Sequence, residues 1–290
     1  MRQVGLKAYA KINLGLDVLR RREDGYHEVR MIMQSVKLYD KLTMKKISKN
    51  EIILNTNLGY LPTNDKNLVY KAIQLMKDEF GITNGVKAEL EKKIPVAAGM
   101  AGGSTDAAAA LVGMDRLFHL KLPKEKLMEL GARLGADVPY CILRGTALSE
   151  GIGEILTPLK PIPPCYILIA KPGINVSTRF VYENLEADKL PFHPDIDGMM
   201  EAIDRGELLG ITDRLSNVLE TVTEKKYPII TKIKDTMMEN GALNSIMSGS
   251  GPTVFGIFDN KKTAMNALEK VDAIELVKSS CVVEPFQPGK

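Results

Sequence analysis

Small residues and glycines fill the segment PVAAGMAGGST at 95–105, which leads directly into an alanine-rich run. Small side chains let backbone N–H groups approach an oxyanion closely, and the free amides and positive dipole end of a following helix add to the attraction. The two commonest phosphate motifs, G-x-x-x-x-G-K-[ST] and G-x-G-x-x-G, do not fit, because no lysine follows the glycines and the spacing differs. A tight turn with a helix cap has the same composition, so the segment alone leaves both interpretations open.

A lysine and a carboxylate are the next candidates for chemistry. Lys11 and Asn13 alternate along the polar face of an expected strand, so their side chains lie side by side. Asp137 follows an expected helix, two residues before Pro139. If a substrate hydroxyl lay between Lys11 and Asp137, the carboxylate could accept its proton and the ammonium could offset the developing negative charge. On residue type alone, Lys11 and Asn13 also fit a solvated strand face, and Asp137 fits a turn.

An aromatic pair, Tyr26 and His27, directly follows the Asp-Gly hairpin signal at 24–25. Such rings could stack on a substrate ring and form hydrogen bonds to it, although hairpin tips carry such residues without a ligand as well. The other histidines, His119 and His193, are not paired at the spacing of metal ligands. We therefore expect no metal-ligating cluster.

The elements that must position these residues alternate between period-two and helical patterns. A further glycine turn, SGSG at 248–251, is compatible with a second anion loop or with a plain hairpin turn. Strands are expected at 4–18, 29–38, 51–57, 86–94, 166–173 and 276–284, and helices at about 64–81, 105–118, 122–135, across 178–240 and at 261–270.

A proline-dense connector, TPLKPIPPC at 157–165, cannot continue a helix or a central strand. It predicts two domains, residues 1–160 and 161–290, with a ligand site in the cleft between them.

Composition limits the class of protein. The 290 residues are 44% hydrophobic and 26% charged, as in an ordinary globular protein, and a net charge of +3 does not favour a nucleic-acid partner. A local basic pocket for an anionic substrate remains open. Cys141, Cys165 and Cys281 are few and widely spaced, which favours a reducing compartment. The N-terminal segment has no apolar signal-peptide core, and no stretch approaches the ~18 apolar residues of a membrane span. We expect a cytoplasmic protein without membrane contact.

Three blocks together resemble the GHMP kinase superfamily, in the order that superfamily uses. They are AYAKINLGL at 8–16, IPVAAGMAGGSTDAAAAL at 94–111 and SIMSGSGPTVFG at 245–256. The middle block is similar to the phosphate loop of the superfamily. Met100 stands where leucine is common, a mild departure because the backbone does the cradling.

Within the superfamily, the segments 10–40 and 134–159 resemble the branch that acts on a cytidine diphosphate substrate in non-mevalonate isoprenoid synthesis. The resemblance implies an α+β fold, with an N-terminal domain like ribosomal protein S5 domain 2 and a ferredoxin-like C-terminal domain. It also implies ATP-dependent phosphorylation of a small-molecule hydroxyl, with Mg²⁺ carried on ATP.

The resemblance further implies roles for individual residues. Lys11 and Asp137 match the catalytic pair, and Ser104 is a candidate Mg²⁺ ligand. The residues matching the ATP site are Asn67, Pro95, Val96, Ala97, Ala98, Gly99, Met100, Ala101, Gly102, Gly103, Ser104 and Thr105. The residues matching the substrate site are Asn13, Tyr26, His27, Ile152, Thr178 and Tyr182.

Two alternatives stay open. Another GHMP kinase, acting on homoserine, mevalonate or a sugar, would share the phosphate loop, but the aromatic residues favour a substrate with a nucleobase. A nucleotide or sugar sensor could have kept the fold and lost catalysis. The presence of both Lys11 and Asp137 argues against a sensor.

Overall fold

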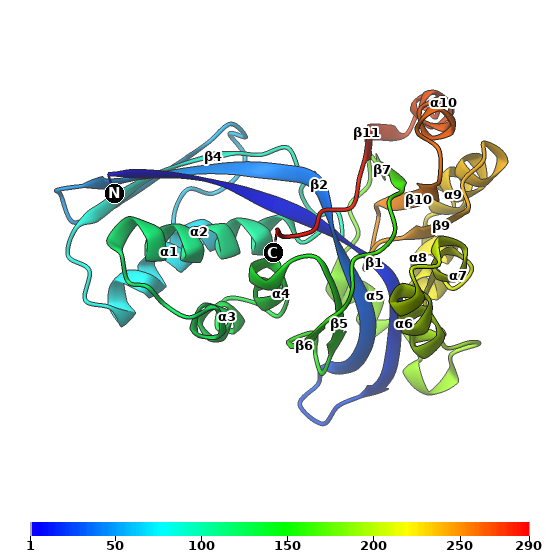
Figure 1. The fold of residues 1–290 in the computed structure, drawn as a ribbon, viewed down its shortest axis with the longest axis horizontal. Helices are drawn as coiled ribbons and strands as arrows, with labels where there is room; N and C mark the ends of the chain where they lie inside the picture. Colours follow the sequence, from blue (N-terminus) through cyan, green and yellow to red (C-terminus); the bar gives the residue numbers. More distant parts are fainter. Residues whose placement is uncertain (1, 290) are drawn as a thin grey trace. The chain divides into compact units, whose positions relative to one another are not determined.

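A computed structural model describes residues 2–289, whose contacts group them into two compact units (Figure 1). The first unit comprises residues up to 10, then 38–96 and 101–143, and the second comprises 11–37, 97–100 and the chain from 144 onward. Two long strands, β1 (Gln3–Arg21) and β2 (His27–Ile47), contribute to both units. The domain boundary at residue 160 stays a prediction.

The first unit joins a twisted sheet to four helices. Strand β4 (Gly85–Glu91) runs antiparallel to β2 and parallel to β3 (Ile52–Thr56). Alternate residues of β4 are buried, so one face of the sheet is apolar and receives the helices. The helices are α1 (Leu68–Glu79), α2 (Gly102–Phe118), α3 (Lys124–Ala132) and α4 (Asp137–Leu143).

Helix α2 is the central helix of this unit, because its alanine-rich sequence allows close packing. A Cβ atom placed on Gly113 would lie 2.5 Å from Met44 Sδ on β2 and 3.0 Å from Leu6 Cδ1 on β1. The helix therefore lies directly on the sheet, with α1 and α4 packed against it. This contact determines where the N-terminus of α2 lies in the unit.

The second unit contains a four-stranded antiparallel sheet in the order β11-β7-β10-β9. Because β9 and β10 are consecutive and helices follow β7 and β10, the topology is β-α-β-β-α-β, which confirms the ferredoxin-like expectation. The strands are β7 (Tyr166–Pro172), β9 (Asn244–Met247), β10 (Val254–Phe258) and β11 (Val277–Val283). The helices of this unit are α5 (Thr178–Glu183), η1 (Ala187–Lys189), α6 (Ile196–Arg205), α7 (Leu208–Thr212), α8 (Glu220–Lys226), α9 (Ile229–Glu239) and α10 (Lys261–Asp272).

Three short strands complete the second unit. Strand β5 (Thr146–Glu150) pairs with β2 and forms a hairpin with β6 (Ile155–Pro158), and β8 (Ser216–Asn217) runs parallel to β1. In this unit β1 no longer alternates, because residues on both of its faces are buried from Lys11 to Val18. Polar side chains on this part of β1 are therefore enclosed by protein.

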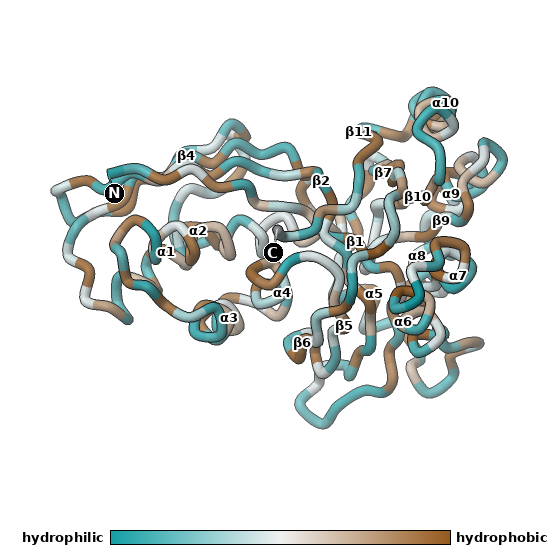
Figure 2. Tube along the Cα trace, viewed as in Figure 1, coloured by the Kyte–Doolittle hydropathy of each residue, from teal (hydrophilic) through white to brown (hydrophobic). Residues whose placement is uncertain are grey.

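Apolar and polar stretches interleave along the chain (Figure 2). Among residues 2–289, no helix has the length and apolar character needed to cross a membrane. Cys141, Cys165 and Cys281 form no disulfide bond among residues 2–289, and burial raises the pKa of the Cys165 thiol to about 12 and that of Cys281 to about 11. Neither thiol forms a reactive thiolate at neutral pH.

Candidate functional site

The segment between β4 and α2 has an unusual backbone. Ala97, Gly99 and Ala101 have φ values of 51°, 72° and 54°, so every second residue is left-handed. A left-handed alanine costs roughly 1–2 kcal/mol, which makes two of them in five residues a candidate functional feature. Alternation of this kind turns successive N–H groups toward one concave side, the arrangement that binds anions in phosphate loops.

The N-terminus of α2, in the first unit, is open to a ligand. Its N-cap residue is Ala101, so no side chain accepts a hydrogen bond from the first turn. By contrast, Asn67, Asp195 and Asn260 cap α1, α6 and α10 with their side chains. Gly103 in the first turn of α2 is exposed. The free amides and the helix dipole fit an anionic group, as expected for residues 95–105.

The Ser248–Gly251 turn between β9 and β10 supports the phosphate loop within the second unit. The Ser248 hydroxyl donates a hydrogen bond to Gly99 O at 3.0 Å, and a Cβ on Gly99 would lie 2.2 Å from Ser248 O. Asn217 on β8 holds the turn, since its Nδ2 donates to Met247 O and Gly249 O at 2.8 Å each. The turn is therefore a backbone support for Gly99. Asn217 was missed in the sequence because it lies where the resemblance is weakest.

Lys11 and Asn13 come together on β1, as their spacing predicts. Lys11 Nζ donates to Asn13 Oδ1 at 2.7 Å, and Lys11 N donates to Met100 O of the phosphate loop at 3.2 Å. Lys11 is 6% exposed and Asn13 is fully buried, so the solvated-face interpretation is wrong. Among the described residues of the second unit, no carboxylate pairs with the Lys11 ammonium. A buried ammonium that donates to a neutral amide, with no carboxylate partner among the described residues of its unit, is suited to an anionic partner.

Asp137 is the first residue of α4 in the first unit, so the alternative interpretation of Asp137 as a turn residue is wrong. The side chain is half-buried, and among the described residues of that unit it has no hydrogen-bond or ion-pair partner. Helix α4 packs against α2 and α3, so the backbone that carries Asp137 is well supported. Because Lys11 and Asp137 belong to different units, their pairing stays a prediction.

Three of the expected substrate residues, His27, Thr178 and Tyr182, are placed in the second unit by their contacts. The rings of His27 and Tyr182 lie 5.1 Å apart with a 37° tilt. Thr178, one turn before Tyr182 on α5, has its hydroxyl 2.8 Å from the Ser250 hydroxyl of the glycine turn. Burial lowers the pKa of His27, and the nearby Arg21 lowers it further, so both favour the neutral imidazole. An aromatic pair and a hydroxyl thus lie on one short helix and its neighbours.

Tyr26 and Ile152 are two further expected substrate residues of the second unit. The Tyr26 side chain is 61% exposed. The backbone N–H of Ile152 donates to Glu154 Oε2 at 2.7 Å within the turn between β5 and β6. The structure therefore gives each a position in the second unit, and their roles stay predictions.

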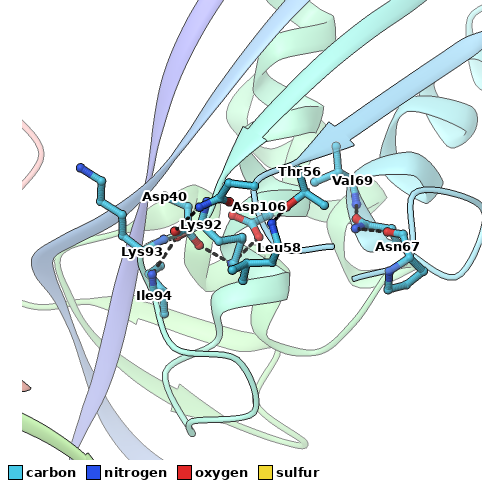
Figure 3. Close-up of polar contacts among 11 residues, drawn as sticks. Asp40, Thr56, Leu58, Asn67, Val69, Lys92, Lys93, Ile94 and Asp106 are labelled. Atoms are coloured by element: carbon cyan, nitrogen blue, oxygen red, sulfur yellow. Dashed lines mark hydrogen bonds and ion pairs between the residues drawn. The ribbon is translucent and has the colours of Figure 1, made fainter. Parts of the chain in front are cut away.

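Asn67 is the N-cap of α1, and both ends of its side-chain amide are used locally. Oδ1 accepts from Val69 N at 2.9 Å, and Nδ2 donates to Pro62 O at 2.8 Å (Figure 3). Its structural role is to start the helix at Leu68, later than the expected start near residue 64. The expected position near adenosine stays a prediction.

No group of three or more histidine, cysteine or acidic residues within residues 2–289 could hold a metal ion. Ser104, in the first turn of α2, is half-buried, with its hydroxyl unpaired among the described residues.

The fold, the open N-terminus of α2 and the buried lysine beside the phosphate loop are those of a small-molecule kinase. The family model "GHMP kinases N terminal domain" matches residues 67–145, and "GHMP kinases C terminal" matches residues 199–276. The chain belongs to the GHMP kinases, which use ATP, and the resemblance of the three sequence blocks is confirmed.

Two relatives and two solved structures match this chain over most of its length. The 4-diphosphocytidyl-2-C-methyl-D-erythritol kinase of Lachnoclostridium phytofermentans is 60% identical over 264 residues, covering 91% of each chain. The enzyme of that name from Lachnospira eligens is 58% identical over 263 residues, again covering 91% of each chain. A crystal structure of 4-(cytidine 5'-diphospho)-2C-methyl-D-erythritol kinase matches with a TM-score of 0.84 and 32% identity, covering 98% of this chain and 100% of that one. A homoserine kinase from Cytophaga hutchinsonii, at 20% identity and a TM-score of 0.73, shares the fold.

Proposed function

We propose that the protein transfers the γ-phosphoryl group of ATP to the 2-hydroxyl of 4-diphosphocytidyl-2-C-methyl-D-erythritol. The products are ADP and the 2-phosphate, and the reaction belongs to non-mevalonate isoprenoid precursor synthesis in the cytoplasm. The observation that carries this assignment is the 60% identity, over nearly the whole chain, to a kinase named for that substrate.

Lys11 and Asp137 are the proposed catalytic residues. Phosphoryl transfer leaves a protein little covalent work, so positioning and charge stabilisation supply most of the rate. Asp137, with no partner inside its own unit, accepts the proton of the substrate hydroxyl or orients it. The Lys11 ammonium, buried beside the phosphate loop, stabilises the negative charge that develops around the hydroxyl.

The backbone amides of residues 95–105 hold the phosphates of ATP in this proposal. Left-handed Ala97, Gly99 and Ala101 and the uncapped N-terminus of α2 fit such an anion. Mg²⁺ usually keeps several waters and binds through one or two protein oxygens plus substrate phosphates, so the unpaired Ser104 hydroxyl fits as its protein ligand. Bound in this way, Mg²⁺ would offset the charge of the phosphates.

The cytidine end of the substrate lies against the aromatic pair in this proposal. His27 and Tyr182 present flat rings 5.1 Å apart, and a nucleobase stacks on such rings. Tyr26 adds a third ring, and Ile152 lines the pocket. Asn13 and Thr178 hold polar groups of the substrate.

The substrate is tested by release of ADP from ATP with each of several acceptors. We expect turnover with 4-diphosphocytidyl-2-C-methyl-D-erythritol and little with the corresponding sugar phosphate that lacks cytidine. Turnover with that sugar phosphate, or with homoserine or mevalonate, at an equal kcat/KM would refute the proposed substrate. ATP binding without turnover on any acceptor would favour the nucleotide sensor.

The catalytic assignment is tested by Asp137→Asn. General acid–base catalysis contributes roughly 10²–10⁴-fold, so we expect kcat to fall by about that factor with a much smaller change in KM. The matched control is Asp78→Asn, which neutralises an exposed carboxylate on α1 of the same unit. Near-normal turnover of a folded Asp137→Asn protein would show that Asp137 has another role.

A further inference from the structure

Three buried charges lie beneath the start of α2 in the first unit. Asp40 is on β2, Lys92 follows β4, and Asp106 is on α2, and none is more than 8% exposed. Because Lys41 pairs with Glu91 in the sheet, the register brings Asp40 next to Lys92. Lys92 Nζ donates to Asp106 Oδ2 at 2.6 Å and also to Asp40 Oδ2 (Figure 3).

This cluster joins the two ends of the phosphate loop. Lys92 lies three residues before Pro95, where the loop begins, and Asp106 directly follows Thr105, where it ends. Asp40 Oδ1 accepts hydrogen bonds from the backbone N–H groups of Lys93 and Ile94, the residues that lead into the loop. The entry and exit of the loop are therefore held by the same three side chains.

The ammonium of Lys92 also lies close to the first residue of α2. A Cβ atom placed on Gly102 would be 3.3 Å from Lys92 Nζ and 3.2 Å from Ile94 Cγ2. Lys92 itself has little freedom, because Asn57 accepts from Lys92 N at 2.8 Å and donates to Lys92 O at 3.2 Å. The Lys92 side chain therefore lies directly against the first turn of α2.

Stability alone does not account for the cluster. Among residues 2–289, Asp106 Oδ1 is buried without a hydrogen-bond partner. Burial raises the pKa of the Asp106 carboxyl well above its usual range; the Lys92 ammonium opposes this rise, and the Asp40 carboxylate adds to it. Burial alone would lower the pKa of Lys92, but Asp106 and Asp40 raise it overall. Buried ion pairs are often no more stabilising than apolar residues of the same volume, so a cluster with an unpaired oxygen points to a positioning role.

We propose that Asp40, Lys92 and Asp106 form a clamp that closes the base of the phosphate loop and orients its backbone amides toward ATP. The proposal rests on the proposed binding of ATP phosphates by residues 95–105. The three side chains are positioning residues, since they act through the loop backbone.

The clamp is tested with the double variant Lys92→Met and Asp106→Leu. It removes the ammonium and one of the two carboxyl groups together, and Asp40 keeps its hydrogen bonds to Lys93 N and Ile94 N. The Asp40 carboxylate loses its buried counter-ion, so the double variant loses stability. We expect the urea midpoint to fall, and the Kd for ATP of the folded protein, measured by calorimetry without urea, to rise at least tenfold.

Two single variants and one control complete the test. Asp106→Leu should weaken ATP binding as the double variant does, and Asp106→Asn should restore it, because an amide oxygen still accepts from Lys92 Nζ. Lys77→Met is the matched control, since it removes a buried ammonium that bonds to Asn50 Oδ1 and to the backbone oxygens of Ile82 and Asn84. The control should lose stability and keep its affinity for ATP.

The outcomes separate the clamp from the proposed function. If the unaltered protein binds ATP, and Asp106→Leu and the double variant bind it within twofold of that affinity, the clamp is overturned and the function stands. If Lys77→Met weakens ATP binding as much as the double variant, the effect is general destabilisation and the clamp is again overturned. If the unaltered protein binds no ATP, the proposed function fails, and the clamp fails with it.

Discussion

Replacing Gly99 by alanine tests whether the phosphate loop depends on the close approach of two backbones in the second unit. The new Cβ would lie 2.2 Å from Ser248 O, a backbone atom that cannot rotate away. An ordinary carbon–oxygen contact is about 3.3 Å or longer, so the two segments must separate by roughly 1 Å. The φ of 72° adds the left-handed cost, roughly 1–2 kcal/mol for a residue with a Cβ.

The two effects have different readouts. The left-handed cost lowers the free energy of unfolding, whereas the displacement moves the amides that hold the phosphates of ATP. Misplacement by about 1 Å can reduce a rate by roughly 10²-fold. We therefore expect kcat/KM for ATP to fall about 100-fold, with a loss of at least ~1 kcal/mol in the free energy of unfolding.

The assay measures ADP release and urea unfolding for Gly99→Ala and for a matched glycine variant. Gly206, the C-cap of α6, has a φ of 70° but no atom within 4 Å of an added Cβ. Gly206→Ala should therefore lose a similar ~1–2 kcal/mol in the free energy of unfolding and retain normal turnover. Normal turnover of ATP by both variants, or an equal loss of activity in both, would refute the proposed role of the close approach at Gly99.

The remaining predictions concern two supports of the glycine turn. Burial raises the pKa of Glu220 to about 7, against the opposing effect of Lys234, and its carboxylate accepts from Met247 N at 2.7 Å. The folded protein thus keeps a proton that the unfolded chain releases between about pH 4.5 and 7, so stability falls as pH rises through that window, by ~1.4 kcal/mol per unit. Between pH 5 and pH 7.5, the free energy of unfolding measured with urea should fall by about 3 kcal/mol more in the unaltered protein than in Glu220→Gln. An equal pH dependence in the two proteins would contradict the assignment. Ser248→Ala deletes the 3.0 Å hydrogen bond to Gly99 O and should raise KM for ATP about fivefold, the equivalent of ~1 kcal/mol, and an unchanged KM would mean that Gly99 is held by packing alone.

Local patterns predicted much of the fold. Alternation over residues 4–18 indicates β1, and the helix expected at about 64–81 is α1. The last strand, expected at 276–284, is β11. The residue patterns that define these elements span only a few neighbouring positions, so the elements can be predicted without the tertiary structure. Their ends differ by a few residues: α1 begins at Leu68, after its N-cap Asn67, and α2 begins at Gly102, before the expected 105.

Part of the candidate site could be predicted from the order of motifs along the chain. The glycine-rich segment 95–105 and its order relative to Lys11 and Asp137 indicate a kinase through resemblance, whereas composition alone left a plain turn equally open. The left-handed backbone at Ala97 and Ala101 has no signal in the residue types, because alanine normally avoids that conformation. The contact of Gly99 with the turn at 248 holds it in place across a long separation in the chain.

By itself, the sequence determined the elements, the family and the residue types available for phosphoryl transfer, because these depend on local spacing and on motif order. Only the tertiary structure decided which polar groups are buried and what they touch. Lys11 and Asn13 look like a solvated strand face until the second unit covers both sides of β1. Asp40, Lys92 and Asp106 look like ordinary surface charges until sheet register and the packing of α2 bring them together. Burial and long-range contact arise from chain segments far apart in sequence, and no local pattern records them.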